Sequence, residues 1–205
     1  MKIGIVGGTF DPIHAAHCYL MEECQRVLGL DRLLVIPNGD PPHKLSTSAK
    51  ASHRLAMTNL ALADYEGLEV CDLEVADPQV SYTFKTLTKL KAMHPEDPFY
   101  FILGADSMIN FQQWKHTEVI IQLATLVCFD RPTYRAEEVD QAIAMVLAQG
   151  GQAIRVNSLE LEISSTEIRQ RIKQHLPHRA FLHPLVYDYI HANGLYQSKE
   201  AEPTD

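Results

Sequence analysis

Short apolar runs rich in β-branched residues alternate along this chain with stretches of helical period, and this alternation limits the possible folds more than any other feature. The predicted strands are Lys2–Val6, Arg32–Ile36, Leu68–Val75, Phe99–Leu103, Ala124–Phe129 and Ala153–Val156. The predicted helices are the stripe through Leu20, Cys24, Val27 and Leu28, and the ranges 52–64, 83–93 and 136–148. Strands separated by helices form crossover units, which build a parallel sheet with helices on both faces. The sequence therefore predicts an α/β fold with its chemistry in the loops that follow the strands.

The length of 205 residues suits one domain, which we expect to span residues 1–197, with residues 198–205 as a flexible C-terminal tail. The formal net charge of −8 disfavours a nucleic-acid partner, because that binding needs a broad basic face. Small phosphate-bearing ligands remain compatible, since the local field decides their binding. The four cysteines show neither a zinc-ligand spacing nor a disulfide framework, and no apolar run reaches 18 residues. We therefore expect a cytoplasmic protein with no membrane partner.

The first predicted strand is followed directly by the residues GGTFDPIHAAH and then by a helix. Gly7 and Gly8 would let the backbone turn tightly and approach a ligand. His14 and His17 are three residues apart at the helix start, so both imidazoles can lie on one face near the positive end of the helix and donate to phosphate oxygens. The alternative is a turn followed by two surface histidines. If either histidine were considered alone, this alternative would be the better explanation.

A second cluster comprises Ser164, Ser165, Thr166 and Arg169. Ser164 and Glu167 have the spacing of a capping box, which predicts a helix start that exposes backbone N–H groups beside hydroxyls. This arrangement suits a phosphate. For the cluster alone, a capped helix with a surface arginine is the commoner explanation. The presence of GGTFDPIHAAH in the same chain makes a phosphate site the favoured one.

The residues PNGDPPHK close the second predicted strand and open the irregular stretch 38–50. Prolines stiffen this path and hold His43 beside Lys44, which suits a clamp on a substrate phosphate. An exposed loop with solvated cations explains the segment equally well. Neither GxGxxG nor GxxxxGK followed by Ser or Thr occurs, which disfavours typical dehydrogenases and P-loop NTPases.

Taken together, the glycine-rich segment with paired histidines and the SSTxIR helix start resemble the HxGH nucleotidyltransferase superfamily. The segments PPHK at 41–44, SYT at 81–83, GADS at 104–107 and NGLY at 193–196, together with Trp114, narrow this resemblance to the bacterial nicotinate-nucleotide adenylyltransferases. The resemblance spans nearly the whole chain, from Ile3 to Tyr196. It implies a Rossmann-like doubly wound parallel sheet and an enzyme of NAD biosynthesis. The implied reaction transfers AMP from ATP to nicotinate mononucleotide and yields nicotinate adenine dinucleotide and pyrophosphate.

The resemblance also implies roles for the residues at matching positions. The catalytic residues, expected to act as electrostatic clamps, are His14, His17, Lys44 and Arg169. The residues expected to bind ATP are Gly7, Gly8, Thr9, Phe10, Gly104, Asp106, Ser164, Ser165 and Thr166. The residues expected to face nicotinate mononucleotide are His43, Tyr82, Thr83, Trp114 and Lys115. Magnesium is expected to be carried by the ATP phosphates, with no metal site on the protein itself.

Ala16 departs from the family pattern, which usually has glycine before the second histidine. We expect its methyl group to narrow the approach of adenine or ribose without abolishing activity. Trp114 either stacks on the pyridine ring or belongs to the core, and Asp106 either accepts hydrogen bonds from a ribose or adenine or caps a helix.

Other acceptors and another class of function remain as alternatives. Nicotinamide mononucleotide and phosphopantetheine are rival acceptors, of which the second is disfavoured because its enzymes are shorter. A nonenzymatic nucleotide sensor is the alternative from a different class, and the retained histidines and Lys44 argue against it. The oligomeric state stays open, a homo-oligomer included, as do the preference for acid over amide and the extent to which the 38–50 segment closes.

Overall fold

The computed structural model describes residues 1–39, 49–77, 82–129, 136–159 and 161–197. Its centre is a sheet of six strands in the order β3-β2-β1-β4-β5-β6. The strands are β1 (Ile3–Gly8), β2 (Arg32–Pro37), β3 (Leu68–Val70), β4 (Phe99–Gly104), β5 (Ala124–Phe129) and β6 (Ala153–Val156). All neighbouring strands pair in parallel, and the order reverses between β1 and β4. This is the Rossmann-like doubly wound arrangement, so the predicted fold class is confirmed.

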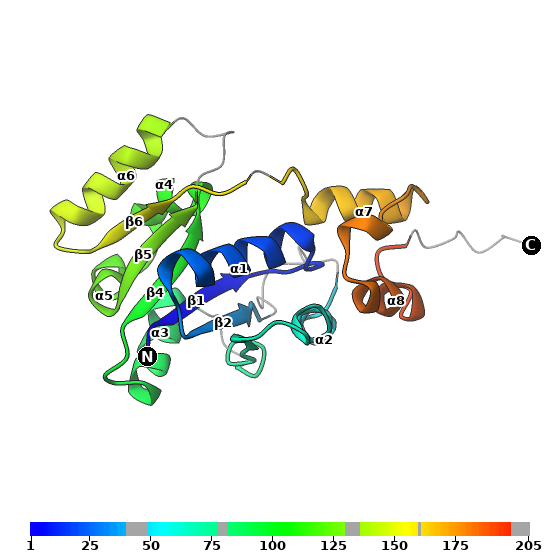
Figure 1. Cartoon of the computed structure of the whole chain (residues 1–205), viewed down its shortest axis with the longest axis horizontal. Helices are drawn as coiled ribbons and strands as arrows, with labels where there is room; N and C mark the ends of the chain where they lie inside the picture. The colour runs from blue at the N-terminus through cyan, green and yellow to red at the C-terminus, as the bar shows by residue number, and fades with distance from the viewer. Residues whose placement is uncertain (40–48, 78–81, 130–135, 160, 198–205) are drawn as a thin grey trace, which may run out of the picture.

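Helices cover both faces of the sheet (Figure 1). One hydrophobic core contains side chains from α1 (Ala15–Leu28), α2 (Ala51–Leu62), α7 (Ser165–Lys173) and α8 (Pro184–Ala192). The other contains side chains from α3 (Thr83–Met93), α4 (Ala105–Ile109), α5 (Thr117–Leu123) and α6 (Ala136–Ala148). Short 3-10 helices span Phe111–Gln113 and Arg179–Phe181. Along β2, Leu33 enters the first core and Leu34 the second, because successive side chains of a strand point to opposite faces.

The first strand extends further than the sequence predicted. Gly7 and Gly8 belong to β1 and pair with Ile36 and Pro37 of β2. The predicted tight turn at these glycines is therefore wrong, because parallel pairing holds them in extended backbone. The chain enters the left-handed region at Phe10, where φ is 49°. The glycines bring the strand itself, and not a turn, to the place where a ligand would lie.

The third strand is shorter than predicted and ends at Val70. The Cys71 N–H still donates to Val35 O at 2.9 Å, and the Ala76 N–H then donates to Asp72 O at 2.8 Å. β3 lies at the edge of the sheet and is paired on one side only, so a local turn can satisfy these backbone groups in place of the ladder. This turn carries Glu74 to the carboxyl ends of the strands.

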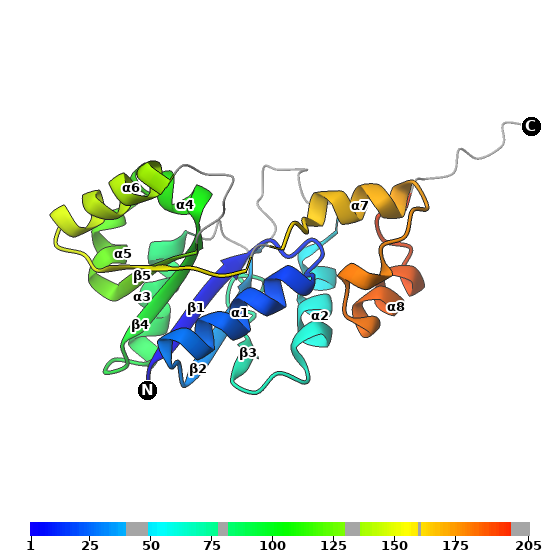
Figure 2. The same ribbon diagram turned by 45° about the horizontal axis from the view of Figure 1, so that its top comes forward.

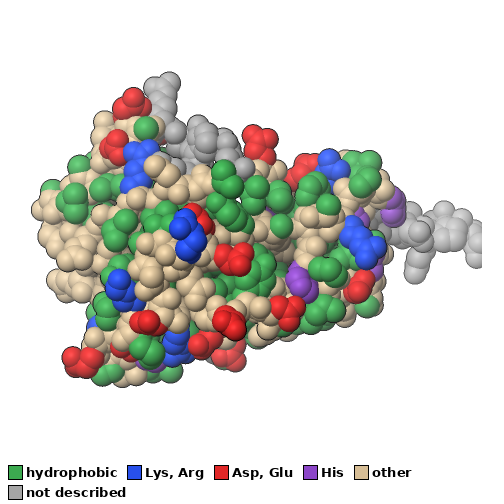
Figure 3. All heavy atoms as spheres, in the orientation of Figure 1, with side chains coloured by type: hydrophobic (Ala, Val, Ile, Leu, Met, Phe, Trp, Pro, Cys, Tyr) green, Lys and Arg blue, Asp and Glu red, His purple; other side chains and the backbone are tan. Residues whose placement is uncertain are grey.

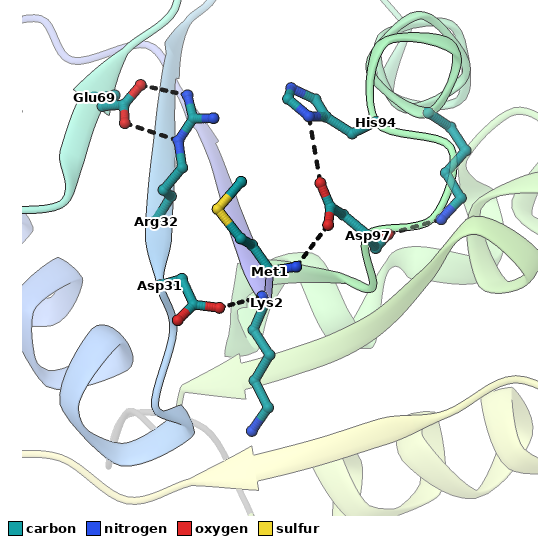
Figure 4. A network of polar contacts seen from close by, with 8 residues as sticks. Met1, Lys2, Asp31, Arg32, Glu69, His94 and Asp97 are labelled. Atoms are coloured by element: carbon teal, nitrogen blue, oxygen red, sulfur yellow. Dashed lines mark hydrogen bonds and ion pairs between the residues drawn. The ribbon is translucent and has the colours of Figure 1, made fainter.

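Polar pairs hold the opposite, amino-terminal edge of the sheet (Figure 4). The α-amino group of Met1 lies 2.6 Å from Asp97 Oδ1, and His94 Nδ1 lies 3.4 Å from Asp97 Oδ2. Arg32 Nε donates to Glu69 Oε1 at 2.7 Å and joins β2 to β3. These contacts lie away from the strand ends where ligands bind in such sheets, so they serve the fold.

The surface and the thiols can be compared with the expectations from composition. Among the described residues, no helix has the length and apolar character needed to cross a bilayer. On the face drawn in Figure 3, basic side chains are interspersed with acidic ones. The cysteines form no disulfides with one another. The predicted tail, 198–205, lies outside the described residues.

Candidate active site

Two cavities lie at the carboxyl ends of β1 and β4, where the strand order reverses. The α1-side cavity has a volume of about 470 Å³, and the α3-side cavity has a volume of about 420 Å³. Both are lined by Gly7, Gly8, Gly104 and Asp106. Either volume lies in the range of small-molecule sites. Because the cavities share these residues as a floor, ligands bound in the two would meet over the strand ends.

The α1-side cavity combines apolar walls with polar groups. Its apolar lining includes Phe10, Ala16, Tyr19, Leu20, Met21, Phe129, Leu161 and Ile163. His14, His17 and Ser164 also line it. Ala16 also lines this cavity, and the expectation that its methyl group narrows the approach of adenine or ribose stays a prediction. Apolar walls combined with histidine and serine side chains suit a flat heterocycle that carries an anionic chain.

The two histidines stack at the start of α1. Their ring centroids lie 3.7 Å apart with an interplanar angle of 24°. His14 is the N-cap residue, and its backbone N–H donates to His17 Nδ1 at 3.3 Å. This contact places the proton of a neutral His17 on Nε2, which is then a donor. The prediction that both imidazoles share a face at the positive helix end is confirmed, and the alternative of two surface histidines is wrong for His14, which is 4% exposed.

Gly8 and Gly104 of the floor lie where an added Cβ atom would meet a neighbouring side chain. A Cβ atom at Gly8 would lie 2.7 Å from the ring of Phe10, which is itself buried and lies edge-on to His17 at 5.2 Å. A Cβ atom at Gly104 would lie 2.7 Å from Asp106 Oδ1. Glycine at these positions avoids those contacts, and the close approach of the backbone to a ligand expected at Gly7 and Gly8 stays a prediction.

The start of α7 lies beside the start of α1 (Figures 1 and 2). Ser164 is its N-cap, and the Ser164 hydroxyl accepts from the Glu167 N–H at 3.1 Å, which confirms the predicted cap. Ser165 Oγ donates to Pro12 O at 2.9 Å. The serine-led helix start and the paired imidazoles are therefore held together across more than a hundred residues of chain.

Arg169 braces the first loop, by which we mean residues 9–14. Its Nη1 donates to Asp11 O at 2.7 Å and its Nη2 donates to Thr166 Oγ1 at 3.2 Å. Ser164 lines the α1-side cavity, whereas Ser165, Thr166 and Arg169 are not among the described residues that line either cavity. The arginine thus brings positive charge close to the first loop while its nitrogens hold that loop in place.

The α3-side cavity is more polar. Thr9, Asn38, Thr83 and Ser107 line it, together with Trp114. Trp114 is half-buried, and its ring centroid lies 6.2 Å from that of Phe101 and 5.7 Å from that of Phe111. The tryptophan therefore packs against the core and also borders the cavity, so the two roles weighed for it from the sequence are compatible.

Glu74 belongs to the site and was missed by the sequence reasoning, which placed it in a strand. Its carboxylate accepts from Thr86 Oγ1 at 2.7 Å, and both residues line the α3-side cavity. A Cβ atom at Gly39 would lie 2.5 Å from Glu74 O, so the glycine of the PNGD segment allows the two backbone segments to lie close together. That glycine was the available signal that another backbone approaches there.

Other predicted residues lie around the cavities. Lys115 Nζ donates to the Tyr82 hydroxyl at 3.1 Å and lies 4.6 Å from the centre of its ring, and neither residue is among those described as lining a cavity. Asp106 lies in the first turn of α4, whose N-cap is Gly104, so Asp106 is not the helix cap. His43 and Lys44 lie outside the described residues. The roles predicted for all of these side chains stay predictions.

Comparisons with known proteins agree with this geometry. The cytidylyltransferase-like family matches residues 5–171. A protein from a Roseiflexus species named "Probable nicotinate-nucleotide adenylyltransferase" is 41% identical, covering 95% of this chain and 98% of the relative. A protein of the same name from Shewanella pealeana is 36% identical and covers 100% of both chains.

Solved structures give the same picture of the fold. The Plasmodium falciparum nicotinic acid mononucleotide adenylyltransferase complexed with NaAD aligns with a TM-score of 0.79 at 24% identity, covering 95% of this chain and 97% of that one. At this identity the likeness supports the fold alone. The relatives and the matched family together show that this chain belongs to the nicotinate-nucleotide adenylyltransferases within the cytidylyltransferase-like family.

Proposed function

We propose that this protein transfers AMP from ATP to nicotinate mononucleotide, forming nicotinate adenine dinucleotide and pyrophosphate in NAD biosynthesis. The observation that carries this proposal is the pair of cavities that share the floor of Gly7, Gly8, Gly104 and Asp106. A nucleotide in each cavity would bring two phosphate groups together over this floor. Transfer of AMP between two nucleotides requires that juxtaposition.

ATP fits the α1-side cavity. Its apolar wall suits the adenine ring, and the imidazoles that also line it suit phosphates. Two helix starts, those of α1 and α7, converge there through the contact between Ser165 and Pro12. The partial positive charge of both helix ends would then act on the triphosphate.

Nicotinate mononucleotide fits the α3-side cavity. The indole of Trp114 borders it and offers a face on which the pyridine ring can stack. Glu74 and Asp106 present carboxylates, which would accept hydrogen bonds from ribose hydroxyls and repel the nicotinate carboxylate. The pyridine carboxylate is therefore expected to lie away from these two residues.

The chemistry needs no general base, because the 5′-phosphate of the mononucleotide is already ionised. What remains is to align two polyanions and to neutralise the charge that develops on the transferred phosphoryl group. We expect the Nε2–H of His17 and the stacked imidazole of His14 to serve this task, which their position at the start of α1 supports. Arg169 adds positive charge while it holds the first loop, and Lys44 is expected to act on the acceptor phosphate.

We further propose that the reaction uses Mg²⁺ carried by ATP. Among the described residues, no group of three His, Cys, Asp or Glu side chains could hold a metal ion, whereas Asp106 lines both cavities. Magnesium is commonly bound by one or two carboxylates with substrate phosphates and water, and this donor set fits that mode. Bound there, the ion would supply charge neutralisation on the phosphates.

Pyrophosphate release tests the proposal. The pure protein is mixed with ATP, Mg²⁺ and, in separate reactions, nicotinate mononucleotide, nicotinamide mononucleotide or phosphopantetheine. We expect release with nicotinate mononucleotide and a much slower reaction with the other two. Release with phosphopantetheine alone would overturn the proposed acceptor, and ATP binding without release for any acceptor would favour the nonenzymatic sensor.

A further inference from the structure

Asp11 joins the first loop to distant parts of the chain. Its Oδ1 accepts from the Tyr196 hydroxyl at 2.7 Å and from the Ala49 N–H at 3.2 Å. Its backbone carbonyl accepts from Arg169 Nη1 at 2.7 Å. Asp11 is only 4% exposed, so water replaces these contacts poorly when one is lost. One buried residue thus ties the first loop to the segment before α2, to α7 and to the end of the described chain.

Arg54 of α2 fastens the same loop from a second direction. Its side chain is fully buried, with Nη1 donating to Thr9 O at 2.7 Å. Its Nε donates to Ala49 O at 3.2 Å and its Nη2 donates to Gly39 O at 3.3 Å. Ala49 is therefore held by its N–H at Asp11 and by its carbonyl at Arg54. Apart from Arg169, the side chains that make these contacts are those of Asp11, Arg54 and Tyr196, none of which is expected to touch substrate. Together they fix the first loop from several directions.

Tyr196 is the most distant member of this framework, 185 residues from Asp11. Its backbone lies in the left-handed region, with φ at 65°, which non-glycine residues seldom adopt. Burial, and next the negative charge of Asp11, raise the pKa of its hydroxyl far above the ordinary value. The hydroxyl therefore remains protonated and donates to Asp11 throughout the physiological pH range. Tyr196 is not among the described residues that line either cavity.

We propose that Tyr196 is a positioning residue, which through the Asp11 carboxylate holds the first loop and Arg169 in the alignment that AMP transfer needs. This inference rests on the proposed function. His14 follows Asp11 by three residues, and Arg169 is bound to the Asp11 carbonyl, so a shift of Asp11 displaces both. Attraction of ATP by charge survives such a shift, whereas in-line alignment does not. Loss of the Tyr196 hydroxyl therefore lowers kcat more than it raises KM for ATP.

Tyr196→Phe and Tyr189→Phe form a matched pair for the test. Each removes one hydroxyl from the C-terminal part of the chain, and the Tyr189 hydroxyl contacts His53 Nδ1 of α2 at 3.0 Å, whereas the Tyr196 hydroxyl contacts Asp11 of the first loop. We expect Tyr196→Phe to lower kcat about tenfold, the effect of roughly one lost hydrogen bond, with KM for ATP changed less than about threefold. Tyr189→Phe should keep the kcat of the unsubstituted protein. Because Tyr196→Phe removes a donor to the buried Asp11, it should also lower the melting temperature, so both rates are measured well below the melting temperature of either variant.

Amide hydrogen exchange gives a readout that does not depend on turnover. We expect Tyr196→Phe to speed exchange in residues 7–17, and Tyr189→Phe to leave that segment unchanged. An unchanged kcat in Tyr196→Phe, or equal losses of rate and exchange protection in both variants, overturns the positioning role. If the unsubstituted protein releases no pyrophosphate, the proposed function fails, and exchange in residues 7–17 still decides whether Tyr196 orders the first loop.

Discussion

Replacing His17 with alanine should affect folding and catalysis by very different amounts. The two ring nitrogens have different roles. His17 Nδ1 accepts the His14 N–H at 3.3 Å, and we expect the Nε2–H to donate to substrate phosphate in the α1-side cavity, which His17 lines. Loss of the Nδ1 contact resembles loss of a helix cap and costs about 1 kcal/mol of unfolding free energy. That cost lowers the melting temperature by about 2–4 °C in a chain of this size.

Loss of the Nε2–H removes a donor that we expect to act on developing charge. Such donors contribute about a hundredfold to a thousandfold in kcat, or roughly 3–4 kcal/mol. Because the interaction strengthens in the transition state, KM for ATP should change little. His17→Ala should therefore lose most of its turnover and retain most of its ATP affinity.

His17→Gln separates the two effects. His17 occupies the third helical position of α1, where glutamine can accept from the N-cap N–H in place of Nδ1. We expect glutamine to restore the melting temperature and not the rate. Pyrophosphate release and thermal unfolding of both variants measure the two quantities. Equal losses of kcat and ATP affinity in His17→Ala, or a near-normal rate in His17→Gln, would refute the role of the imidazole.

Three further substitutions test other parts of the structure. Trp114→Ala should raise KM for nicotinate mononucleotide about tenfold, as expected for loss of ring stacking, and leave KM for ATP nearly unchanged. A defect in ATP use alone would show that the pyridine ring lies elsewhere. Ala16→Gly should lower KM for ATP by a small factor, because it removes a methyl group from a residue that lines the cavity. The substitution should also cost up to about 1 kcal/mol of helix stability. A raised KM for ATP would contradict this prediction. The hydrogen bond from the Met1 α-amino group is the main cause that lowers the pKa of Asp97. The stabilisation is therefore present above the ordinary carboxyl pKa and is lost as pH falls through the lowered one. Asp97→Asn should destabilise the protein at pH 7 and reduce its acid sensitivity, as measured by melting temperature against pH, and an unchanged acid limb would refute the link.

The fold could be predicted because its signals are local. The run Ala124–Phe129 is apolar except for Thr125 and forms a strand with those bounds, and the helical period over 83–93 gives a helix with those bounds. The strand predicted for Leu68–Val75 was too long. The strand ends at Val70 because β3 lies at the edge of the sheet, and no local sequence pattern reveals that position. The turn expected at Gly7 and Gly8 failed for a similar reason, since pairing with β2 keeps them extended.

The site could be predicted in part. The histidine stack and the Ser164 cap follow from spacing along a single helix, so the sequence contains them. Glu74 enters the α3-side cavity through a turn at the sheet edge, and Arg54 meets the first loop only in the folded chain. Such long-range partners leave no periodic signal. Tyr196 was part of the NGLY motif, but its contact with Asp11 joins residues 185 positions apart and arises only in the folded chain.

The central claim is that two nucleotides occupy the two cavities and exchange AMP over their common floor. A crystal structure with nicotinate adenine dinucleotide tests it most directly. We predict that adenine lies beside Ala16 in the α1-side cavity, that the pyridine ring lies against Trp114, and that the bridging phosphates lie over Gly8 next to the histidine pair. A product bound wholly within one cavity, or with its phosphates away from His14 and His17, would contradict the account.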